Sequence, residues 1–187
     1  MDAFWTDEEM LFRDKARDFF CGRERCRPPL DLAIPSELGL SGRIAVVEEA
    51  AFHDPKLGRE LASSGEGSAS ADRIVDGILH LAFLAGTASC VLDAGSQAAR
   101  ERGDFSSSLM GCREVQESLA GLASGAELLR LGTCRLCRLL ERGERDRADA
   151  EAARLLAGAG VIARNIKAVA LSLLGEPWIA ENLPGEY

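Results

Sequence analysis

Apolar residues recur at intervals of three and four positions along most of this chain, which is the pattern of helices that bury one face. In the N-terminal third, this pattern predicts three short helices, over residues 6–20, 44–52 and 57–62. In the remainder it predicts three long helices, over residues 71–102, 108–141 and 147–174. No stretch alternates apolar and polar residues as a half-buried strand does. The pattern therefore predicts an all-α protein whose C-terminal part is a helical bundle.

A run of small polar residues, 63–70, interrupts the helical pattern and is typical of a linker. We expect it to divide the chain into an N-terminal helical segment, 1–62, and a C-terminal helical bundle, 71–187. Glycines are frequent inside the long helices of that bundle, for example Gly86 and Gly158. Each glycine inside a helix costs about 1 kcal/mol relative to alanine. We therefore expect close approach between helices to compensate.

The composition is that of a folded, water-soluble protein. The 187 residues are 47% hydrophobic and 28% charged, which excludes a disordered chain. Lys and Arg number 22 against 30 Asp and Glu, so the formal net charge is −8 and no nucleic-acid partner is expected. The apolar runs are interrupted before they reach the roughly 18 residues of a membrane span, and the acidic N-terminus does not resemble a signal peptide. We expect a cytoplasmic protein without a membrane partner.

Cysteine and histidine offer little chemistry in this chain. Six cysteines without an export signal favour free thiols over disulfides. Cys134 and Cys137 have the spacing of a redox or metal-binding pair, but they lie in a leucine-rich helical stretch without a second pair. We interpret them as buried small apolar residues and leave a redox role open. His53 and His80 are the only histidines, so no metal site is expected.

Several short sequence runs occur along the chain in a fixed order. That order is more specific to a protein family than any single run. Residues 6–19 and 46–51 are followed by the runs 86–93 and 100–105, and Gln116 then lies near the start of the next helix. In this order the chain resembles the acyl-CoA dehydrogenase family. The resemblance implies a flavoenzyme built from an N-terminal helical domain, a middle β-domain and a C-terminal, up-down four-helix bundle.

The chain departs from that family in two places. The linker at 63–70 stands where the family has its β-domain, which holds the flavin ring. Near the end of the chain, Glu176 and Trp178 replace glycines of the family's Gly-rich segment, and the sequence stops before the last helix. Glycines in such a loop let the backbone approach a cofactor closely, whereas a glutamate repels a pyrophosphate. The catalytic glutamate of most members lies beyond this point, so we expect no equivalent of it in this chain.

The resemblance also implies individual site residues. Asp76 matches the position where some members carry the catalytic base, although Asp is shorter than Glu. Arg102 and Phe105 match the motif whose arginine contacts the FAD pyrophosphate of the neighbouring subunit. The family's next glutamine position is Arg113 here, and Gln116 lies one turn later. The residues alone leave other interpretations open: Asp76 as a solvated acid at a helix start, and Arg102 as a cation that complements the dipole at a helix end.

These observations lead to three hypotheses. We favour a helical subunit that is not catalytic alone and that pairs with a homologous acyl-CoA dehydrogenase or with itself. In this hypothesis FAD binds only in trans, with Arg102 contributed to the partner's site, and acyl-CoA is a further candidate ligand. The second hypothesis is an FAD-dependent acyl-CoA oxidoreductase that acts by itself, with Asp76 as its base. The third is a homo-oligomeric helical scaffold or binding module without a cofactor.

Overall fold

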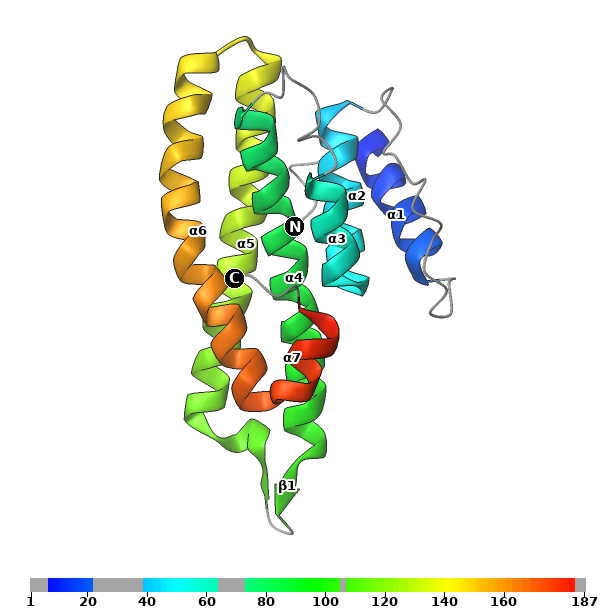
Figure 1. Ribbon diagram of the computed structural model, residues 1–187, viewed down its shortest axis with the longest axis vertical. Helices are drawn as coiled ribbons and strands as arrows, with labels where there is room; N and C mark the ends of the chain where they lie inside the picture. Colours follow the sequence, from blue (N-terminus) through cyan, green and yellow to red (C-terminus); the bar gives the residue numbers. More distant parts are fainter. Residues whose placement is uncertain (1–6, 22–38, 64–72, 105–106, 184–187) are drawn as a thin grey trace.

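The computed structural model describes residues 7–21, 39–63, 73–104 and 107–183. In the N-terminal part these residues form α1 (Asp7–Cys21), α2 (Leu40–His53) and α3 (Pro55–Ser63). The remaining helices are α4 (Arg73–Glu101), α5 (Arg113–Glu141), α6 (Arg145–Leu173) and α7 (Glu176–Asn182). Between α4 and α5 lie the paired strands β1 (Gly103–Asp104) and β2 (Ser107–Ser108) and the short 3-10 helix η1 (Leu109–Gly111). The all-α prediction is confirmed (Figure 1).

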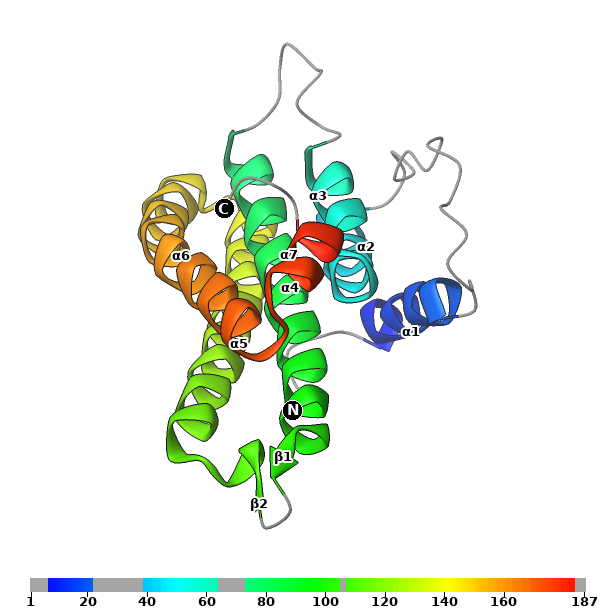
Figure 2. The same cartoon turned by 60° about the horizontal axis from the view of Figure 1, so that its bottom comes forward.

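The three long helices α4, α5 and α6 run alternately up and down and pack along one another as a helical bundle (Figure 1). α2 and α3 pack against α4, and α1 lies outside them against α2 (Figure 2). The N-terminal helices therefore lie directly against the C-terminal bundle, and α4 is the element that both groups share.

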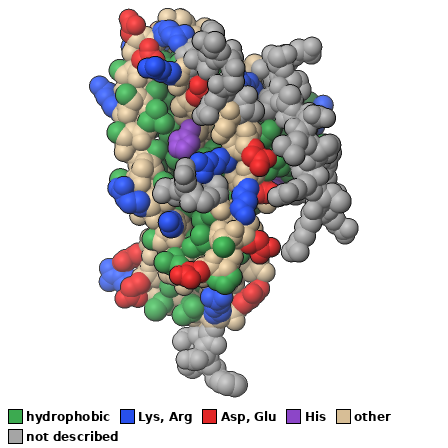
Figure 3. Space-filling model, viewed as in Figure 1, with side chains coloured by type: hydrophobic (Ala, Val, Ile, Leu, Met, Phe, Trp, Pro, Cys, Tyr) green, Lys and Arg blue, Asp and Glu red, His purple; other side chains and the backbone are tan. Residues whose placement is uncertain are grey.

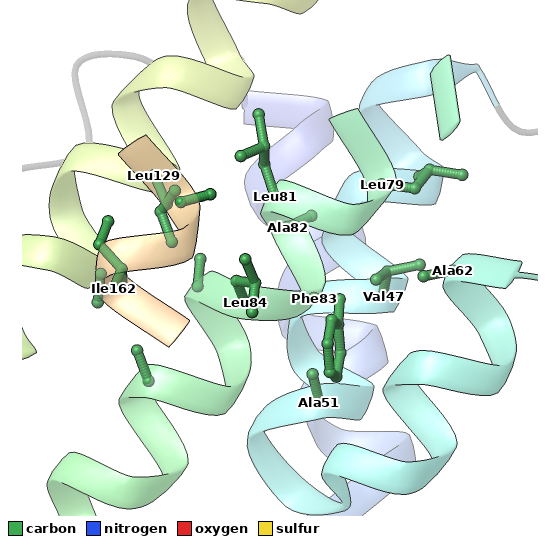
Figure 4. Close-up of a cluster of buried hydrophobic side chains, with 14 of the residues drawn as sticks. Val47, Ala51, Ala62, Leu79, Leu81, Ala82, Phe83, Leu84, Leu129 and Ile162 are labelled. Carbon is green, nitrogen blue, oxygen red and sulfur yellow. The ribbon is translucent and has the colours of Figure 1, made fainter. Parts of the chain in front are cut away.

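α4 is central because its middle turns are apolar on every side. Leu79 and Phe83 point toward α2, where they lie near Val47 (Figure 4). Leu84 points the other way, toward Leu129 of α5 (Figure 4). All five side chains are buried. Burying a large apolar side chain stabilises a fold by about 1.5–3 kcal/mol, so helices on both sides of α4 contribute to one continuous core.

α2 is longer than the sequence pattern predicts. It begins at Leu40 rather than at residue 44, so it includes Gly42, which lies outside the predicted helix. Leu40 is partly buried against the core, and this packing outweighs the low helix propensity of the glycine. Thr6, where the first helix is predicted to begin, and the linker residues 64–70 lie outside the described residues.

α3 also begins earlier than predicted, at Pro55 rather than at residue 57. The carboxylate of Asp54 accepts hydrogen bonds from the backbone N–H groups of Lys56 and Leu57, at 3.0 and 3.3 Å. Because the first N–H groups of a helix have no partner inside it, such a cap stabilises the helix start. Asp54 therefore follows the last residue of α2 and also caps the start of α3.

Gly86 allows α2 and α4 to approach each other closely. A β-carbon at this position would overlap the backbone carbonyl of Glu48 and would lie 2.8 Å from the β-carbon of Ala51. At Gly86, the close approach between helices that we expected to compensate for a helical glycine is confirmed. At Gly158 and Gly160 of α6 the expected close approach of another helix is wrong. Among the described residues, no other helix lies within 4 Å of a β-carbon added at either position.

Two helices, α4 and α6, are long and apolar enough to cross a membrane by length and composition alone. This differs from our expectation that the apolar runs are too short, because both helices tolerate a few charges within an apolar window. In α4, 67% of that window is buried, as in the core helix of a globular protein. In α6 only 28% is buried, and hydrophobic side chains appear among the charged ones on the surface (Figure 3).

Candidate functional site

The residues that the sequence singles out lie at the two ends of α4. Asp76 is in the first turn of this helix, and Arg102 directly follows its last residue, Glu101. At a rise of about 1.5 Å per residue, Asp76 and Arg102 are roughly 39 Å apart. A carboxylate and a guanidinium so far apart cannot act on the same reacting atoms. Within one subunit, these two candidates therefore do not form a single catalytic centre.

Arg102 joins the end of α4 to the end of α6. Its Nη1 donates a hydrogen bond of 2.8 Å to the backbone oxygen of Leu173, in the last turn of α6. Its backbone oxygen accepts a hydrogen bond from the N–H of Leu109 at 2.9 Å, which positions η1. The residue as a whole is exposed. Because a guanidinium has several N–H donors, the bond to Leu173 leaves others that can bind an anion.

Gln116 lies at the same end of the bundle, in the first turn of α5. Its Nε2 donates a hydrogen bond of 2.8 Å to the backbone oxygen of Met110 in η1. Gln116 and Arg102 thus both hold the connection between α4 and α5, at the lower end of the bundle in Figure 1. Phe105, which matches the same motif as Arg102, lies outside the described residues. The structure brings Arg102 and Gln116 to one exposed end and places Asp76 at the other.

Asp76 is half-buried at the opposite end of α4. The residue after it, Gly77, faces α6, where an added β-carbon would lie 3.0 Å from Cδ1 of Leu156. A carboxylate in the first turn of a helix interacts favourably with the unpaired N–H groups there. The position of Asp76 is therefore favourable for the helix start, and its role as a catalytic base stays a prediction.

The segment that resembles the family's Gly-rich loop is a helix in this protein. Glu176 and Trp178 both lie in α7, which follows Gly175 in a left-handed conformation with φ of 87°. Trp178 is partly buried and packs against the hydrophobic core. Lys56 of α3 donates hydrogen bonds from Nζ to the backbone oxygens of Ala180 and Glu181, at 3.1 and 2.6 Å. These contacts hold α7 as a packed helix, a different structure from an open loop around a cofactor.

A cluster of buried charges joins the N-terminal helices to the bundle, and the sequence analysis missed it. Glu48 and Glu49 of α2 are only 2% and 3% exposed. Arg130 of α5 binds the Glu48 carboxylate through Nε. From α1, Arg13 reaches Glu48 at 3.2 Å and Glu49 at 3.0 Å, and Arg17 reaches Glu49 at 3.1 Å. Each buried carboxylate thus has two guanidinium partners.

Arg130 has further partners on α4 and α5. Its Nη1 donates to Glu127 at 2.6 Å, and its Nη2 donates to the hydroxyl of Ser89 at 2.9 Å. Burial alone would lower the pKa of Arg130, but Glu48 and Glu127 raise it, so the guanidinium remains charged. The signal that could have revealed this cluster is the pair of acids inside the apolar run of α2. Paired buried charges occur at functional sites and in structural networks alike, and here every charge has a partner within the chain.

The cysteine pair of α5 does not form a disulfide. Both thiols are buried, Cys134 with 8% and Cys137 with 5% exposure. Sγ of Cys137 lies 3.5 Å from a carboxylate oxygen of Glu141. The interpretation of the two cysteines as small buried residues is confirmed. In the described ranges of the chain, no three His, Cys, Asp or Glu residues come together as metal ligands.

Comparison with protein families gives a match to the C-terminal part of the chain. Residues 76–178 match the family model of the acyl-CoA dehydrogenase C-terminal domain. The match covers more than half of the chain, from the first turn of α4 into α7. Neither the curated proteins nor the solved structures gave a significant match.

Proposed function

This chain belongs to the acyl-CoA dehydrogenase family, and we propose that it is a helical subunit of that family which is not catalytic by itself. In this proposal the chain pairs with a homologous dehydrogenase subunit. It contributes Arg102, supported by Gln116, to the FAD site of that subunit. The chain thereby acts as a structural and cofactor-binding partner of an enzyme that carries the reaction.

The observation that carries the proposal is the helix α7. In the family this segment is glycine-rich and contacts the cofactor, whereas here Glu176 and Trp178 lie in a helix that packs on the core. A backbone that is hydrogen-bonded as a helix and held against the core by Trp178 cannot approach a pyrophosphate closely. The loss of this loop removes a cofactor contact that the chain would need in order to work alone.

The connection between α3 and α4 supports the same conclusion. Ser63 ends α3 and Arg73 begins α4, so nine residues join them. Nine residues cannot form the β-domain that holds the flavin ring in the family, because even a small domain needs roughly 50 residues. The division of the chain at 63–70 thus remains part of the proposal.

The exposed end of the bundle, where Arg102 and Gln116 lie, is suited to contact FAD that is bound by another subunit. Arg102 is exposed and retains N–H donors beyond the one that binds Leu173, which suits recognition of phosphate oxygens. Gln116 holds η1 beside it. When FAD is bound in the partner, the flavin supplies the redox chemistry. In this proposal Asp76 takes no part, because it lies at the far end of α4.

The proposal is tested by co-purification from the native host, followed by measurement of flavin in the complex. We expect the chain to be recovered with a homologous dehydrogenase. Arg102→Gln is expected to weaken FAD retention by that complex, whereas Arg100→Gln, also exposed and in the last turn of α4, is expected to leave it unchanged. Recovery of the chain without any dehydrogenase would contradict the proposal.

A second measurement separates this function from an enzyme that acts alone. The purified chain is mixed with FAD and examined for bound flavin and for acyl-CoA oxidation. We expect neither flavin uptake nor activity. Stable binding of FAD by the isolated chain, with activity lost in Asp76→Asn, would instead support the autonomous oxidoreductase.

A further inference from the structure

A groove with a basic lining lies between the C-terminal third of α5 and the first turn of α6, at the upper end of the bundle in Figure 1. It encloses about 470 Å³. Four exposed arginines line it: Arg135, Arg138 and Arg142 from the α5 side and Arg147 from α6. Among the described residues, Glu144 is the one acid in the lining. In a chain with a formal net charge of −8, this groove concentrates positive charge.

The stability of the α5 end does not account for all of these arginines. Arg135, Arg138 and Arg142 follow one another at intervals of three and four residues, so they lie along one side of the helix. A cation favours a helix end through the dipole, but this effect falls off beyond the last turn. Arg138 is in that last turn and Arg142 follows the helix, whereas Arg135 lies a turn further back.

Carboxylates offset only part of the charge in the groove. Nε of Arg135 lies 2.8 Å from Glu151, and Nη1 of Arg147 binds Glu144. These two acids against four arginines leave an excess of two positive charges. A guanidinium has several N–H donors, so one bond to a carboxylate leaves others for a ligand. The groove therefore suits an anion with two negative charges.

The groove also has an apolar wall. Leu131, Cys134 and Leu139 line it together with the arginines. Cys134 and Leu139 are buried, while Leu131 is 45% exposed. A cavity of this volume, with apolar side chains and a few charged groups, is typical of small-molecule sites. A ligand with a short apolar group beside its charges would cover Leu131.

We infer that this groove binds a soluble phosphate monoester that carries a short apolar group. A phosphate monoester has nearly two negative charges at neutral pH, which matches the excess in the groove. Its oxygens also accept paired hydrogen bonds from guanidinium groups. A carboxylate supplies only one charge. An anionic lipid surface is disfavoured, because Glu141 and Asp146 are exposed beside the same turn and repel it.

This groove is separate from the FAD contact of the proposed function. α5 has 29 residues, so at about 1.5 Å per residue its two ends are roughly 44 Å apart. Arg102 lies near the start of α5, where it positions η1, and the groove lies at the other end. The inference therefore goes beyond the proposed function and requires neither a dehydrogenase partner nor FAD.

The experiment is isothermal titration calorimetry of the purified full chain, with hexyl phosphate as the probe. We expect saturable binding of one hexyl phosphate per chain. Inorganic phosphate lacks the apolar group and hexanoate lacks the second charge, so each is expected to bind at least roughly fivefold more weakly. Arg138→Gln and Arg142→Gln are each expected to weaken the binding of hexyl phosphate roughly tenfold.

Matched controls locate the binding in the groove. Arg154→Gln, exposed on α6 and outside the lining, is expected to leave the affinity for hexyl phosphate unchanged. Leu131→Ser is expected to weaken hexyl phosphate but not inorganic phosphate. Leu128→Ser, 58% exposed and outside the lining, is expected to change neither affinity. Circular dichroism checks that each variant remains helical.

Three outcomes would overturn the inference. The first is a wild-type chain that gives no saturable binding of hexyl phosphate. The second is equal weakening by Arg142→Gln and Arg154→Gln, which would reduce the effect to overall charge. The third is binding to phosphatidylcholine vesicles only when they contain phosphatidic acid, without binding of hexyl phosphate, which would make a lipid surface the source of the phosphate. Co-purification of a dehydrogenase is independent of all three, so failure of this site and failure of the proposed function are distinguishable.

Discussion

The guanidinium of Arg130 on α5 binds the carboxylate of Glu48 on α2, and this ion pair joins the N-terminal helices to the C-terminal bundle. The Arg130 side chain is 20% exposed and that of Glu48 is 3% exposed, so the pair is largely shielded from water. A charge that is shielded from water in this way needs an opposite charge beside it to offset the cost of its desolvation. Removal of either partner leaves the other with an uncompensated desolvation penalty.

Replacement of Arg130 by methionine tests this dependence. We expect Arg130→Met to lower the free energy of unfolding by about 3 kcal/mol, because Glu48 then remains buried with Arg13 as its only guanidinium partner among those described. Urea unfolding followed by circular dichroism measures the change.

The control is Arg135→Met, also on α5. Arg135 pairs with Glu151 at 2.8 Å, but its side chain is 61% exposed, so we expect a loss of no more than about 1 kcal/mol. If the two variants lose the same stability, burial of the Arg130 pair is not the cause.

Gly86 and Gly158 are expected to respond in opposite ways to alanine. Gly86→Ala forces a methyl group against the α2 backbone and is expected to destabilise the protein by roughly 1–3 kcal/mol. Gly158→Ala meets open space and is expected to stabilise it by about 1 kcal/mol. Thermal and urea unfolding measure both variants. A stabilising Gly86→Ala would show that α2 and α4 are not in close contact.

Cys90 makes stability depend on pH in the alkaline range. Burial first, and then the nearby Asp93 and Asp54, raise the pKa of this thiol from 9.0 to about 12. Below pH 9 both the folded and the unfolded chain keep the proton, so this group contributes no pH dependence. Between pH 9 and pH 12 only the unfolded chain releases it, so stability falls as pH rises. Cys90→Ala is expected to reduce that fall, measured by urea unfolding across this range.

The raised pKa of the Cys90 thiol also predicts that this residue is alkylated slowly. Because the thiolate is the nucleophile, a thiol with a pKa of about 12 reacts little at neutral pH. Cys112 is exposed and provides the comparison in the same molecule. Mass spectrometry after brief iodoacetamide treatment is expected to find the label on Cys112 and not on Cys90. Equal labelling would contradict the burial of Cys90.

Lys56 is expected to hold α7 in place. Its Nζ binds the last carbonyl groups of that helix, at Ala180 and Glu181, and so satisfies acceptors that have no partner within α7. Lys56→Met is expected to speed hydrogen exchange in α7 while the rest of the bundle exchanges as before. Unchanged exchange in residues 176–182 would mean that core packing of Trp178 alone holds the helix.

Much of the fold could be predicted from the sequence because its signals are local. In α5, Leu119, Leu122 and Leu129 repeat at helical intervals, and this spacing alone indicates a buried face. The run at 86–93 carried the resemblance to the acyl-CoA dehydrogenase family, and the match over residues 76–178 shows that relationship. α7 was not predicted, because seven residues are too few for a periodic pattern and its helix depends on contacts from α3.

The candidate site was predictable only in part. The sequence placed Asp76 and Arg102 on one helix, and a count of residues between them was enough to separate them. It did not reveal that Arg102 binds Leu173 or that Glu48 is buried, because those partners lie 71 and 82 residues away in the chain. Local spacing carries no information on which distant helix covers a given side.

By itself, the sequence determined the helices α1 to α6, the bundle and the family, since each of these follows from residue types and their spacing along the chain. Only the tertiary structure decided which of two helical glycines is covered by a neighbouring helix. Gly86 and Gly160 both lie inside long helices, yet one is pressed against the α2 backbone and the other faces solvent. The reason is physical: burial depends on the neighbour in space, and the neighbour is set by how all the helices pack together.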